Sequence, residues 1–489
     1  MDLFIGLDVG TSAVKGVLLS SEGLQLALGK RSTRLLSPQP GFIEVEPEEH
    51  YRSVCDLIRE LASHVPAGVK VRGISMAFAS GNTMLLDEKD RPLINIINWM
   101  DERAFNQMEE IFPGLDKHSV YNMVGWPFNR GWFPMAHLGW LKKHQPKTYR
   151  RAARYCMNSD WLMYRLTGRW GMDYSTASTF YLIDQVNHCW HKPYLDMLEI
   201  PEEAISKLGP SGSVLGPLTH QGAEDTGLSE KTLVVLGAFD HPSAARGTGF
   251  INVGDLLLSC GTSWVGFYPI ADRSLGISQE LLVDPFLTPN GPWATLFSLP
   301  EIGRRIDWYL ENLVLKEEEN PDEKYAIFSE SSEKAPPGAR GHYINPFLDS
   351  KNIPEAEIDL HAHRSREEIA RAVMEGPALR MRYNIERLAR AGIRADRIAM
   401  VGGPSESPVW PRIVAEITGL ELKLINGQTA GAVGAAILAS VGAGLFRDER
   451  EAFSAMGGEG TVITPSADAV KVYDPIYQQF LEKYVHEQV

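Results

Sequence analysis

The stretch "MDLFIGLDVGTSAVKGVLLSSEG" (1–23) decides how this chain begins. An apolar run ends at Asp8, a polar turn of Gly10, Thr11 and Ser12 follows, and Lys15 stands at the start of a second apolar run. Two apolar runs separated by turn residues predict a strand, a tight turn and a second strand. We therefore expect a strand-turn-strand unit with an acid before the turn and a base after it.

A second stretch, "LLLSCGTSWVGFYPI" (256–270), repeats this form about half a chain later. Aligned on the turn, Gly261 and Thr262 match the first copy, whereas Ser259 and Gly266 stand where the first copy has its acid and its base. Successive backbone N–H groups in such a turn form a concavity that binds anions, and glycine leaves room for close approach. We therefore expect two similarly built halves whose turns hold a polyphosphate between them.

The bulk composition excludes several classes of protein. The chain has 489 residues, more than one hydrophobic core usually organises, so we expect at least two domains. The net charge of −14 argues against a nucleic-acid binder, which needs a basic face. The four cysteines lack metal-site or redox-motif spacing, and no apolar run is long enough for a membrane span. With no recognisable signal peptide either, we expect a cytoplasmic protein without nucleic-acid or membrane partners.

Between and after the two turns, predicted strands alternate with predicted helices. "TLVVLGAFDHPSAARGTG" (232–249) predicts a buried strand that ends at Asp240 and then a helix of small residues. We place the domain boundary just after it, which gives domains 1–246 and 247–489. Alternating strands and helices indicate an α/β fold.

The second half contains three further predicted elements. "SREEIARAVMEG" (365–376) opens with a capping box and predicts a long helix that Pro377 kinks. "RIAMVGGPSESPVWPRIVAEITG" (397–419) predicts a strand, a turn and a helix. "GQTAGAVGAAILASVGAG" (427–444) predicts a helix whose small residues allow close backbone packing.

Asp8 and Lys15 each have two readings. A carboxylate beside a phosphate-binding turn can hold Mg²⁺, which is usually shared between one or two carboxylates, substrate phosphates and water. Asp8 alone could equally cap its turn through a side-chain hydrogen bond. Lys15 is either a phosphate contact or a surface lysine of a hairpin.

Asp240 and the Gly402-Gly403 turn are the other candidates. Ligands of open α/β sheets bind at the carboxyl ends of strands, and a carboxylate there could act as a general base towards a hydroxyl group. Asp240 could equally be the N-cap of the following helix. The Gly402-Gly403 turn is either a nucleotide contact or a tight turn without a ligand. Together these groups fit phosphoryl transfer, where catalysis is mostly positioning and charge neutralisation.

The order of the segments resembles the FGGY family of carbohydrate kinases, relatives of the actin and heat-shock ATPase fold. The resemblance covers nearly the whole chain. Its segments are "IGLDVGTSAVKGVLL" (5–19), "LLDEKDRPLINIINWMDERA" (85–104), "NSDWLMYRLTG" (158–168), "TGLSEKTLVVLGAFDHPSAARGTG" (226–249), "SCGTSW" (259–264), "REEIARAVMEG" (366–376), "GGPSESPVWPRIVAEITG" (402–419) and "AGAVGAAILA" (430–439). It implies two ribonuclease-H-like domains with a cleft between them.

The resemblance also implies roles for individual residues. The first phosphate motif is implied at Gly10, Thr11, Ser12 and Lys15 with Asp8 near Mg²⁺, the second at Gly261 and Thr262, and the nucleotide segment at Gly402, Gly403 and Ser407. Asp240 falls on the catalytic base, and His241 falls where relatives often place an amide that contacts the sugar. Asp101 and Arg103 on the sugar side are either structural or in contact with substrate, and Trp99 is either a substrate contact or part of the core.

The expected sugar side departs from the nearest branches of the family. The segment "GGPSESPVW" (402–410) resembles xylulokinases, but Ser80 and Gly81 stand where xylulokinases have a Met-His pair and glycerol kinases an Arg-Glu pair. Asn82 beside them could supply hydrogen bonds or could be a plain turn residue. This departure leaves the phosphate motifs intact and questions xylulose itself as the substrate.

We therefore expect an ATP- and Mg²⁺-dependent kinase that phosphorylates a hydroxyl group of a small sugar, ketopentose or polyol. The alternatives are a kinase of the same family for a tetritol, pentitol, ribulose or glycerol-like substrate, and a non-catalytic ATPase of the same superfamily. A sugar-sensing transcriptional regulator is disfavoured because no basic helix-turn-helix region is recognisable. The resemblance further implies a homodimer.

Overall fold

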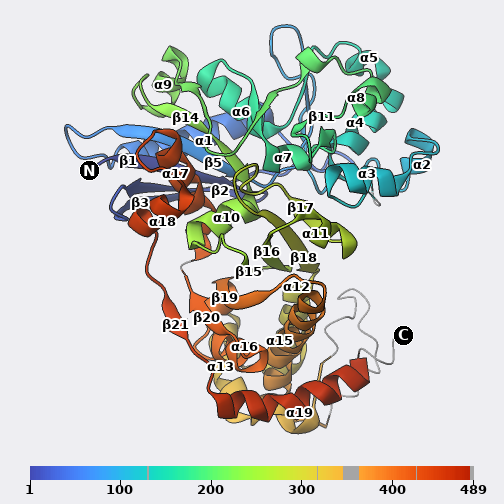
Figure 1. Ribbon diagram of the computed structural model, residues 1–489, viewed down its shortest axis with the longest axis vertical. Helices are drawn as coiled ribbons and strands as arrows, with labels where there is room; N and C mark the ends of the chain where they lie inside the picture. The colour runs from blue at the N-terminus through green and yellow to red at the C-terminus, as the bar shows by residue number, and fades with distance from the viewer. Residues whose placement is uncertain (129–130, 317, 345–362, 426, 485–489) are drawn as a thin grey trace. The chain divides into compact units, whose positions relative to one another are not determined.

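The computed structural model describes residues 1–128, 131–316, 318–344, 363–425 and 427–484 (Figure 1). Its contacts divide the chain into two compact units, and each unit is assembled from separate segments of the sequence. The first unit comprises residues 1–251, 271–295 and 429–458, and the second comprises residues 252–270, 296–428 and 459–489. Two segments from the second half of the sequence therefore belong to the first unit.

A six-stranded sheet of order β13-β14-β5-β1-β2-β3 forms the centre of the first unit. Strand β1 (Leu3–Val9) pairs antiparallel with β2 (Ala13–Ser20) and parallel with β5 (Val71–Phe78), which pairs parallel with β14 (Leu233–Phe239). The edge strands are β3 (Gln25–Ser32) and β13 (Val214–Pro217). The carboxyl ends of β1, β5 and β14 thus lie at one edge of the sheet, where ligands of such folds bind.

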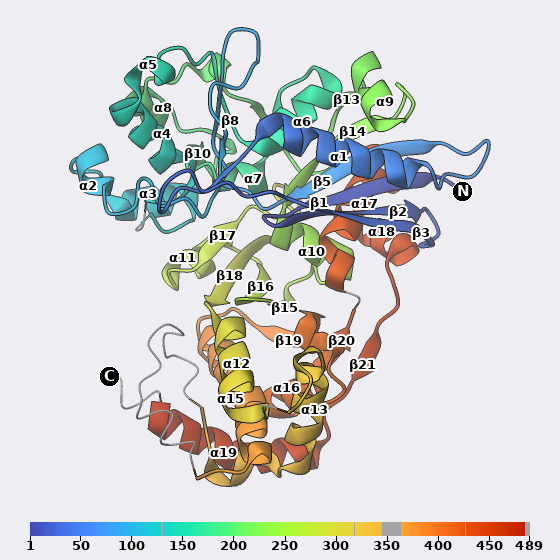
Figure 2. The same cartoon turned by 180° about the vertical axis from the view of Figure 1, so that it is seen from behind.

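Helices cover both faces of this sheet. On one face α1 (Pro47–Ala62) packs on apolar side chains that alternate along β1, including Leu7 (Figure 2). On the other face α17 (Ala430–Gly442), which comes from the far end of the sequence, packs directly on the strand. A Cβ atom at Gly6 would lie 1.9 Å from the carbonyl oxygen of Ala432, so glycine is needed for this close approach. The predicted helix of small residues is confirmed.

The rest of the first unit is a mostly helical region with its own apolar core. It is centred on aromatic and aliphatic side chains such as Trp126, Phe180 and Tyr181. Its larger elements are α3 (Lys117–Val124), α4 (Phe133–His144), α7 (Tyr174–Ser178), α8 (Lys192–Leu198) and α11 (Arg273–Ser278). Helices α6 (Asn158–Thr167) and α9 (His220–Thr226) instead pack with α1 in the core of the six-stranded sheet.

The second unit has a sheet built in the same way as the first. Strand β15 (Gly254–Cys260) pairs antiparallel with β16 (Trp264–Ile270) and parallel with β19 (Ala395–Gly402). The sheet extends through β18 (Trp293–Leu299) on one side and through β20 (Glu421–Leu424) and β21 (Thr461–Ile463) on the other. Both predicted strand-turn-strand units are therefore confirmed, and so is the two-domain α/β fold.

Long helices pack around the second sheet. They are α12 (Ile302–Tyr309), α13 (Lys324–Lys334), α15 (Arg366–Arg390), α16 (Trp410–Thr418) and α19 (Ala467–Tyr484). The capping box at the start of α15 is confirmed, because Ser365 accepts from the N–H of Glu368 and the Glu368 side chain accepts from the N–H of Ser365. The helix is one continuous element across Pro377.

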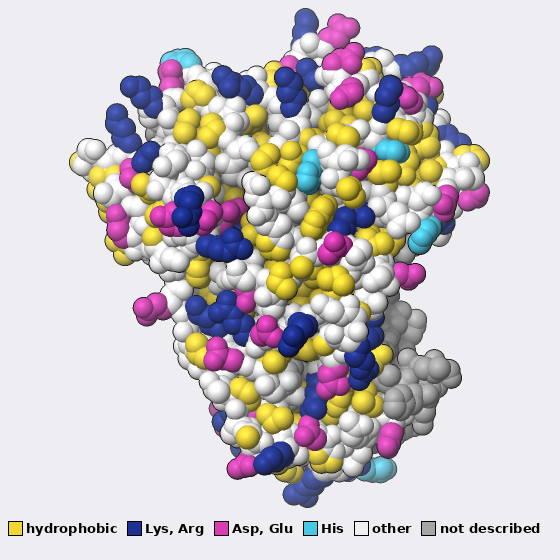
Figure 3. Space-filling view, viewed as in Figure 1, with side chains coloured by type: hydrophobic (Ala, Val, Ile, Leu, Met, Phe, Trp, Pro, Cys, Tyr) yellow, Lys and Arg dark blue, Asp and Glu magenta, His cyan; other side chains and the backbone are white. Residues whose placement is uncertain are grey.

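The surface shows no segregation of charge on the face drawn in Figure 3. Basic and acidic side chains are interspersed over it. Among the described residues, no helix combines the length and the apolar character that crossing a membrane requires.

Candidate active site

The first phosphate turn is closed by one backbone hydrogen bond. The N–H of Gly10 donates to the carbonyl oxygen of Ala13, with 3.0 Å between the two atoms, which leaves Thr11 partly exposed and Ser12 exposed at the tip. The indole Nε1 of Trp99 donates to Thr11 Oγ1 at 2.8 Å. Because the indole nitrogen is only a donor, the Thr11 hydroxyl accepts this bond and keeps its own proton for another acceptor, such as a phosphate oxygen.

Asp8 and Asp240 occupy the same edge of the first sheet. Asp8 lies near the end of β1, and Asp240 is the first residue of α10 (Asp240–Thr248), directly after β14. Burial, followed by the negative charge of Asp240, raises the pKa of Asp8 to about 7, against the opposing effect of Lys15, its cross-strand partner. Burial also raises the pKa of Asp240, against the effect of His241. Two poorly solvated carboxylates thus lie close enough to influence each other electrostatically where both parallel strands end.

The structure bears on the alternative readings of these two acids. The N-cap of α10 is Phe239, so Asp240 does not occupy the capping position, and its Oδ1 accepts from the backbone N–H of His241 at 2.7 Å. In the first turn, the N–H of Gly10 donates to the carbonyl oxygen of Ala13 and not to the Asp8 side chain. Both carboxylates therefore keep acceptor capacity for a ligand.

Helix α17 fixes the surroundings of both acids, a feature that local sequence patterns did not predict. A Cβ atom at Gly431 would lie 3.0 Å from Cγ of Asp8, and the Ser243 hydroxyl of α10 donates to the carbonyl oxygen of Gly431 at 2.9 Å. A Cβ atom at Gly434 would lie 1.8 Å from the carbonyl oxygen of Ser243. In the sequence, the repeated small residues of 427–444 indicated that this helix packs closely, but not which segment it packs against.

A clustered metal site is not found in the described ranges, where no group of three or more His, Cys, Asp or Glu side chains could together hold an ion. The two neighbouring carboxylates, Asp8 and Asp240, nevertheless fit Mg²⁺, because this ion usually takes one or two carboxylates and completes its shell with phosphate oxygens and water. A cation at this place would also offset the repulsion that raises the pKa of Asp8.

The turn after β5 carries Ser80, Gly81 and Asn82. The Ser80 hydroxyl donates to the carbonyl oxygen of Phe78 at 3.2 Å. Gly81 has a φ of +91°, and a Cβ atom there would lie 2.3 Å from the Phe133 ring. Asn82 is 4% exposed: its amide group donates to the carbonyl oxygen of Ala79 and to Asn158, and its oxygen accepts from the N–H of Trp99. The contacts of Asn82 thus fit the reading of a turn residue.

Asp101 and Arg103 form a buried ion pair. Asp101 is fully buried and accepts from the N–H of Ile43, while Arg103 reaches both Asp101 and Glu44. The guanidinium carbon of Arg103 also lies 4.3 Å from the centroid of the Phe42 ring. Of the two readings predicted for this pair, the contacts favour the structural one.

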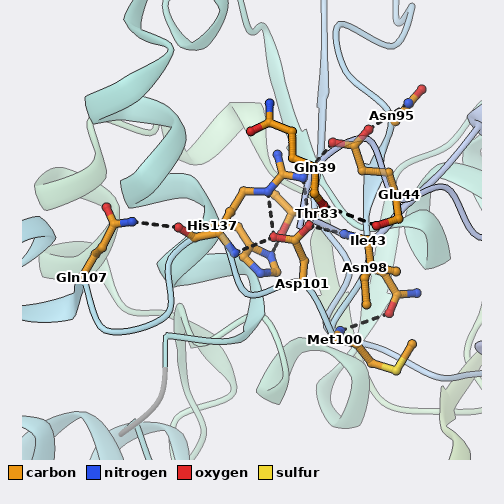
Figure 4. Close-up of polar contacts among 12 residues, drawn as sticks. Gln39, Ile43, Glu44, Thr83, Asn95, Asn98, Met100, Asp101, Gln107 and His137 are labelled. Carbon is orange, nitrogen blue, oxygen red and sulfur yellow. Dashed lines mark hydrogen bonds and ion pairs between the residues drawn. The ribbon is translucent and has the colours of Figure 1, made fainter. Parts of the chain in front are cut away.

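His137 is a second buried polar residue of this region (Figure 4). Its Nδ1 lies 3.0 Å from Thr83 Oγ1, and burial lowers the pKa of His137 to about 4. The ring is therefore neutral at physiological pH. His241 is partly buried next to Asp240, with its ring edge-on to Phe239 at 5.5 Å between centroids.

The second turn lies in the second unit and is held by the first turn of α12. The N–H of Gly261 donates to the carbonyl oxygen of Ser263 at 3.1 Å, and the N–H of Gly303 donates to the carbonyl oxygen of Thr262 at 2.9 Å. A Cβ atom at Gly303 would lie 2.5 Å from the carbonyl oxygen of Gly261. Gly303 is thus a support that the sequence patterns did not reveal.

A pocket of about 780 Å³ opens beside this turn, wholly inside the second unit. Gly261, Thr262, Gly403 and Ser407, all predicted from sequence, line it. Gly402, which directly precedes the lining residue Gly403, has a φ of +98°. A Cβ atom at Gly402 would lie 2.2 Å from the carbonyl oxygen of Cys260. The other lining residues come mainly from α12 and α13 and include Arg304, Asp307, Tyr325, Ser329 and Glu330.

The residues of α12 and α13 could not be found from sequence, because nothing in their local pattern points to a ligand. Tertiary packing brings Ser329 to Ser407, with 3.0 Å between the two hydroxyl oxygens. The structure thus gathers the predicted residues into two groups. Gly10, Thr11, Ser12, Lys15, Asp8, Asp240 and the turn at 80–82 lie in the first unit, and the second turn with the Gly402-Gly403 segment lies in the second.

Comparison with known proteins gives a consistent result. The models for the N-terminal and C-terminal domains of the FGGY family of carbohydrate kinases match residues 3–247 and 256–443. A xylulose kinase of Bacillus subtilis is 26% identical over 99% of this chain and 97% of its own length, and an autoinducer-2 kinase of an Enterobacter species is 25% identical over 100% and 95%. The crystal structure of xylulose kinase from Rhodospirillum rubrum superimposes with a TM-score of 0.86 at 25% identity, covering 99% of both chains. That of gluconate kinase from Lactobacillus acidophilus gives 0.84 at 22% identity, which supports the fold alone.

Proposed function

This chain belongs to the FGGY family of carbohydrate kinases, and we propose that Asp240 is the base through which it phosphorylates a hydroxyl group of a small sugar or polyol. The activity is an ATP-dependent sugar phosphorylation. The observation that carries the assignment is the pair of poorly solvated carboxylates, Asp8 and Asp240, at the ends of β1 and β14.

In the proposed reaction Asp240 accepts the proton of the acceptor hydroxyl. The alkoxide oxygen forms a bond to the γ-phosphorus of ATP while the bond from that phosphorus to the bridging oxygen breaks, and ADP leaves. The raised pKa of Asp240 makes its carboxylate a stronger base than an exposed aspartate, which suits this role.

We assign the binding of the ATP phosphates to the turn at residues 10–12 and to the turn at residues 261–262. Ser12 offers its backbone N–H group, Thr11 offers its hydroxyl proton, and Lys15 offers positive charge, while Gly10 leaves room for close approach. Gly261 and Thr262 would act in the same way from the second unit, next to the 780 Å³ pocket for the nucleoside at Gly402, Gly403 and Ser407. Mg²⁺, held at Asp8, would neutralise phosphate charge when bound.

For the acceptor we propose a ketopentose or a polyol of similar size. Similarity to a xylulose kinase supports this class of acceptor. The sequence identity to an autoinducer-2 kinase is about as high, which supports an acceptor other than xylulose itself. The acceptor side is assigned to Ser80, Gly81, Trp99 and His241. The Phe133 ring lies where a side chain at position 81 would project, so the acceptor meets an aromatic ring there.

The experiment is a screen for ADP release with Mg²⁺, ATP and a panel of ketopentoses, pentitols, tetritols and glycerol. We expect turnover with one stereochemical series, and loss of that turnover in Asp240→Asn with ATP binding retained. Near-normal turnover in Asp240→Asn would remove this residue from the mechanism. No turnover with any acceptor would shift the proposal to a non-catalytic ATPase.

Three further expectations belong to this proposal. The sugar and nucleotide sides are assigned to 1–246 and 247–489, in keeping with the residues that the family models match. A homodimer is expected, which light scattering after size-exclusion chromatography tests. A cytoplasmic location is expected, which fractionation of the source cells tests.

A further inference from the structure

Three buried polar side chains hold the strand end and the helix that flank Asp240 without belonging to the site itself. Ser175, Arg246 and Asp284 are at most 1% exposed, and they come from two separate segments of the first unit, 1–251 and 271–295. Burying charged and polar groups costs free energy unless they are well paired. Their partners show what this group of residues holds in place.

Ser175 contacts the strand end that carries the base. It lies on α7, and its Oγ donates to Asp284 Oδ2 at 2.7 Å. The backbone N–H of Phe239, the residue before Asp240, points to the same Oγ at 3.4 Å. A hydroxyl group has one proton, so its use by Asp284 orients a lone pair of Ser175 towards the N–H of Phe239.

Arg246 contacts the helix that carries the base. It lies on α10, six positions after Asp240, and its Nη2 donates to the carbonyl oxygen of Phe286 at 2.7 Å. The N–H of Phe286 in turn donates to Asp284 Oδ1 at 2.9 Å. The guanidinium carbon lies 4.7 Å from the centroid of the Phe286 ring. Residues 284–286 therefore hold both β14, through Ser175, and α10, through Arg246.

We propose that Asp284, acting through Ser175, is a positioning residue for Asp240. The turn from β14 into α10 sets where the carboxylate of Asp240 points, and the two anchors on 284–286 fix this turn from both sides. The proposal rests on the proposed role of Asp240 as the base. It also gives a function to segment 271–295, which lies beyond Asp240 in the sequence but packs in the same unit.

The test compares serine variants on one short helix. Ser175→Ala removes the hydroxyl group that bonds to both Asp284 and Phe239, whereas Ser175→Thr keeps it. Ser178→Ala is the matched control, because Ser178 is buried on the same helix and bonds to Tyr174 and Gln185 without contacting Phe239. Asp284→Asn is the second variant, because its amide nitrogen can only donate, so the side chain can no longer accept from both Ser175 and the N–H of Phe286.

We expect kcat to fall at least about tenfold in Ser175→Ala and Asp284→Asn with KM for ATP within about twofold, because misplacing a catalytic group by about 1 Å can cost about a hundredfold in rate. Ser175→Thr and Ser178→Ala should keep kcat within about twofold. Equal kcat in Ser175→Ala and Ser178→Ala would overturn the proposal, and the serine series decides it even if Asp284→Asn fails to fold. Turnover in Asp240→Asn would instead overturn the assignment of the base, so the two failures are distinguishable.

Discussion

The indole N–H of Trp99 donates a hydrogen bond to the hydroxyl oxygen of Thr11, with 2.8 Å between Nε1 and Oγ1. The backbone N–H of Trp99 also donates to Asn82, in the turn assigned to the acceptor. One residue thus joins the first phosphate turn to the acceptor side within a single unit. This contact gives Trp99 a specific role beyond the two readings, substrate contact or core packing, that the sequence left open.

Trp99→Phe should weaken ATP use without unfolding the protein. The ring is kept but the donor is lost, so the Thr11 hydroxyl is no longer fixed with its proton free for phosphate. One hydrogen bond contributes about 0.5–1.5 kcal/mol, so we expect kcat/KM for ATP to fall by about two- to tenfold. Steady-state kinetics with saturating acceptor measure this. Trp190→Phe is the control, because Trp190 also loses an indole hydrogen bond of 2.8 Å, to Ser206, outside the site; an equal effect in both variants would contradict the role of Trp99.

Asp8→Asn should abolish turnover and yet stabilise the protein at alkaline pH. The pKa of Asp8 is raised from 3.8 to about 7 in the folded state, so its carboxyl group favours folding at low pH and this contribution is lost as pH rises from about 4 through 7. At 1.4 kcal/mol per pKa unit, the neutral amide should add up to about 4 kcal/mol at pH 8 and little at pH 4. Urea unfolding without Mg²⁺ and ATP measures the difference.

The same measurement in an Asp240→Asn background tests the pairing of the two acids. Because the charge of Asp240 contributes to the raised pKa of Asp8, the stabilisation by Asp8→Asn should shrink when Asp240 is neutral. Strict additivity of the two substitutions would show that the carboxylates do not interact.

Gly81→Ala should impair acceptor binding more than a change of backbone preference explains. Gly81 has a φ of +91°, and the new Cβ atom would lie 2.3 Å from the Phe133 ring. Gly114→Ala is the matched control, since Gly114 has a φ of +71° and a Cβ atom added there would meet nothing within 4 Å. We expect both variants to lose about 1 kcal/mol from backbone strain, but only Gly81→Ala to raise KM for the acceptor, by about tenfold or more. Equal acceptor KM values would remove Gly81 from the acceptor side.

Glu375→Ala should be severely destabilising. Glu375 is 1% exposed and accepts from Arg371 at 2.6 Å, from the Tyr473 hydroxyl at 2.8 Å and from the N–H of Gly338. Its loss leaves the buried charge of Arg371 unpaired, which costs about 3–5 kcal/mol. Arg390→Ala, on the same helix, breaks an exposed pair with Glu386 and should cost less than about 1 kcal/mol. Chemical denaturation compares the two, and similar losses would contradict this account.

Local patterns predicted the elements that carry the site. The apolar runs around 3–19 and 256–270 become β1-β2 and β15-β16, and the run before Asp240 becomes β14. These predictions hold because a buried strand needs an apolar run and a tight turn needs glycine or small polar residues, and both requirements are visible within a few residues. The family resemblance, which the matches to both family domains confirm, added the order of the segments.

The partners of these elements follow from long-range packing. Sequence patterns indicated that 427–444 packs closely, but not that α17 lies on β1 and beside Asp8 in the first unit. Sequence patterns also did not indicate that the hydroxyl groups of Ser329 and Ser407 are hydrogen-bonded, or that Asp101 and Arg103 form an ion pair. A side chain's partner depends on which distant segment is packed against it, and one chain's local periodicity does not carry that information.

The sequence by itself therefore determined where the strands end and which acids and glycines stand at those ends, because these follow from burial and turn chemistry over short distances. Only the tertiary structure decided that Asp8 and Asp240 lie close enough to interact electrostatically, that Trp99 reaches Thr11, and that Ser175 bonds to Asp284. Asp8 and Asp240 meet because parallel strands bring their carboxyl ends to one edge of a sheet. The other two contacts are side-chain hydrogen bonds between residues 88 and 109 positions apart.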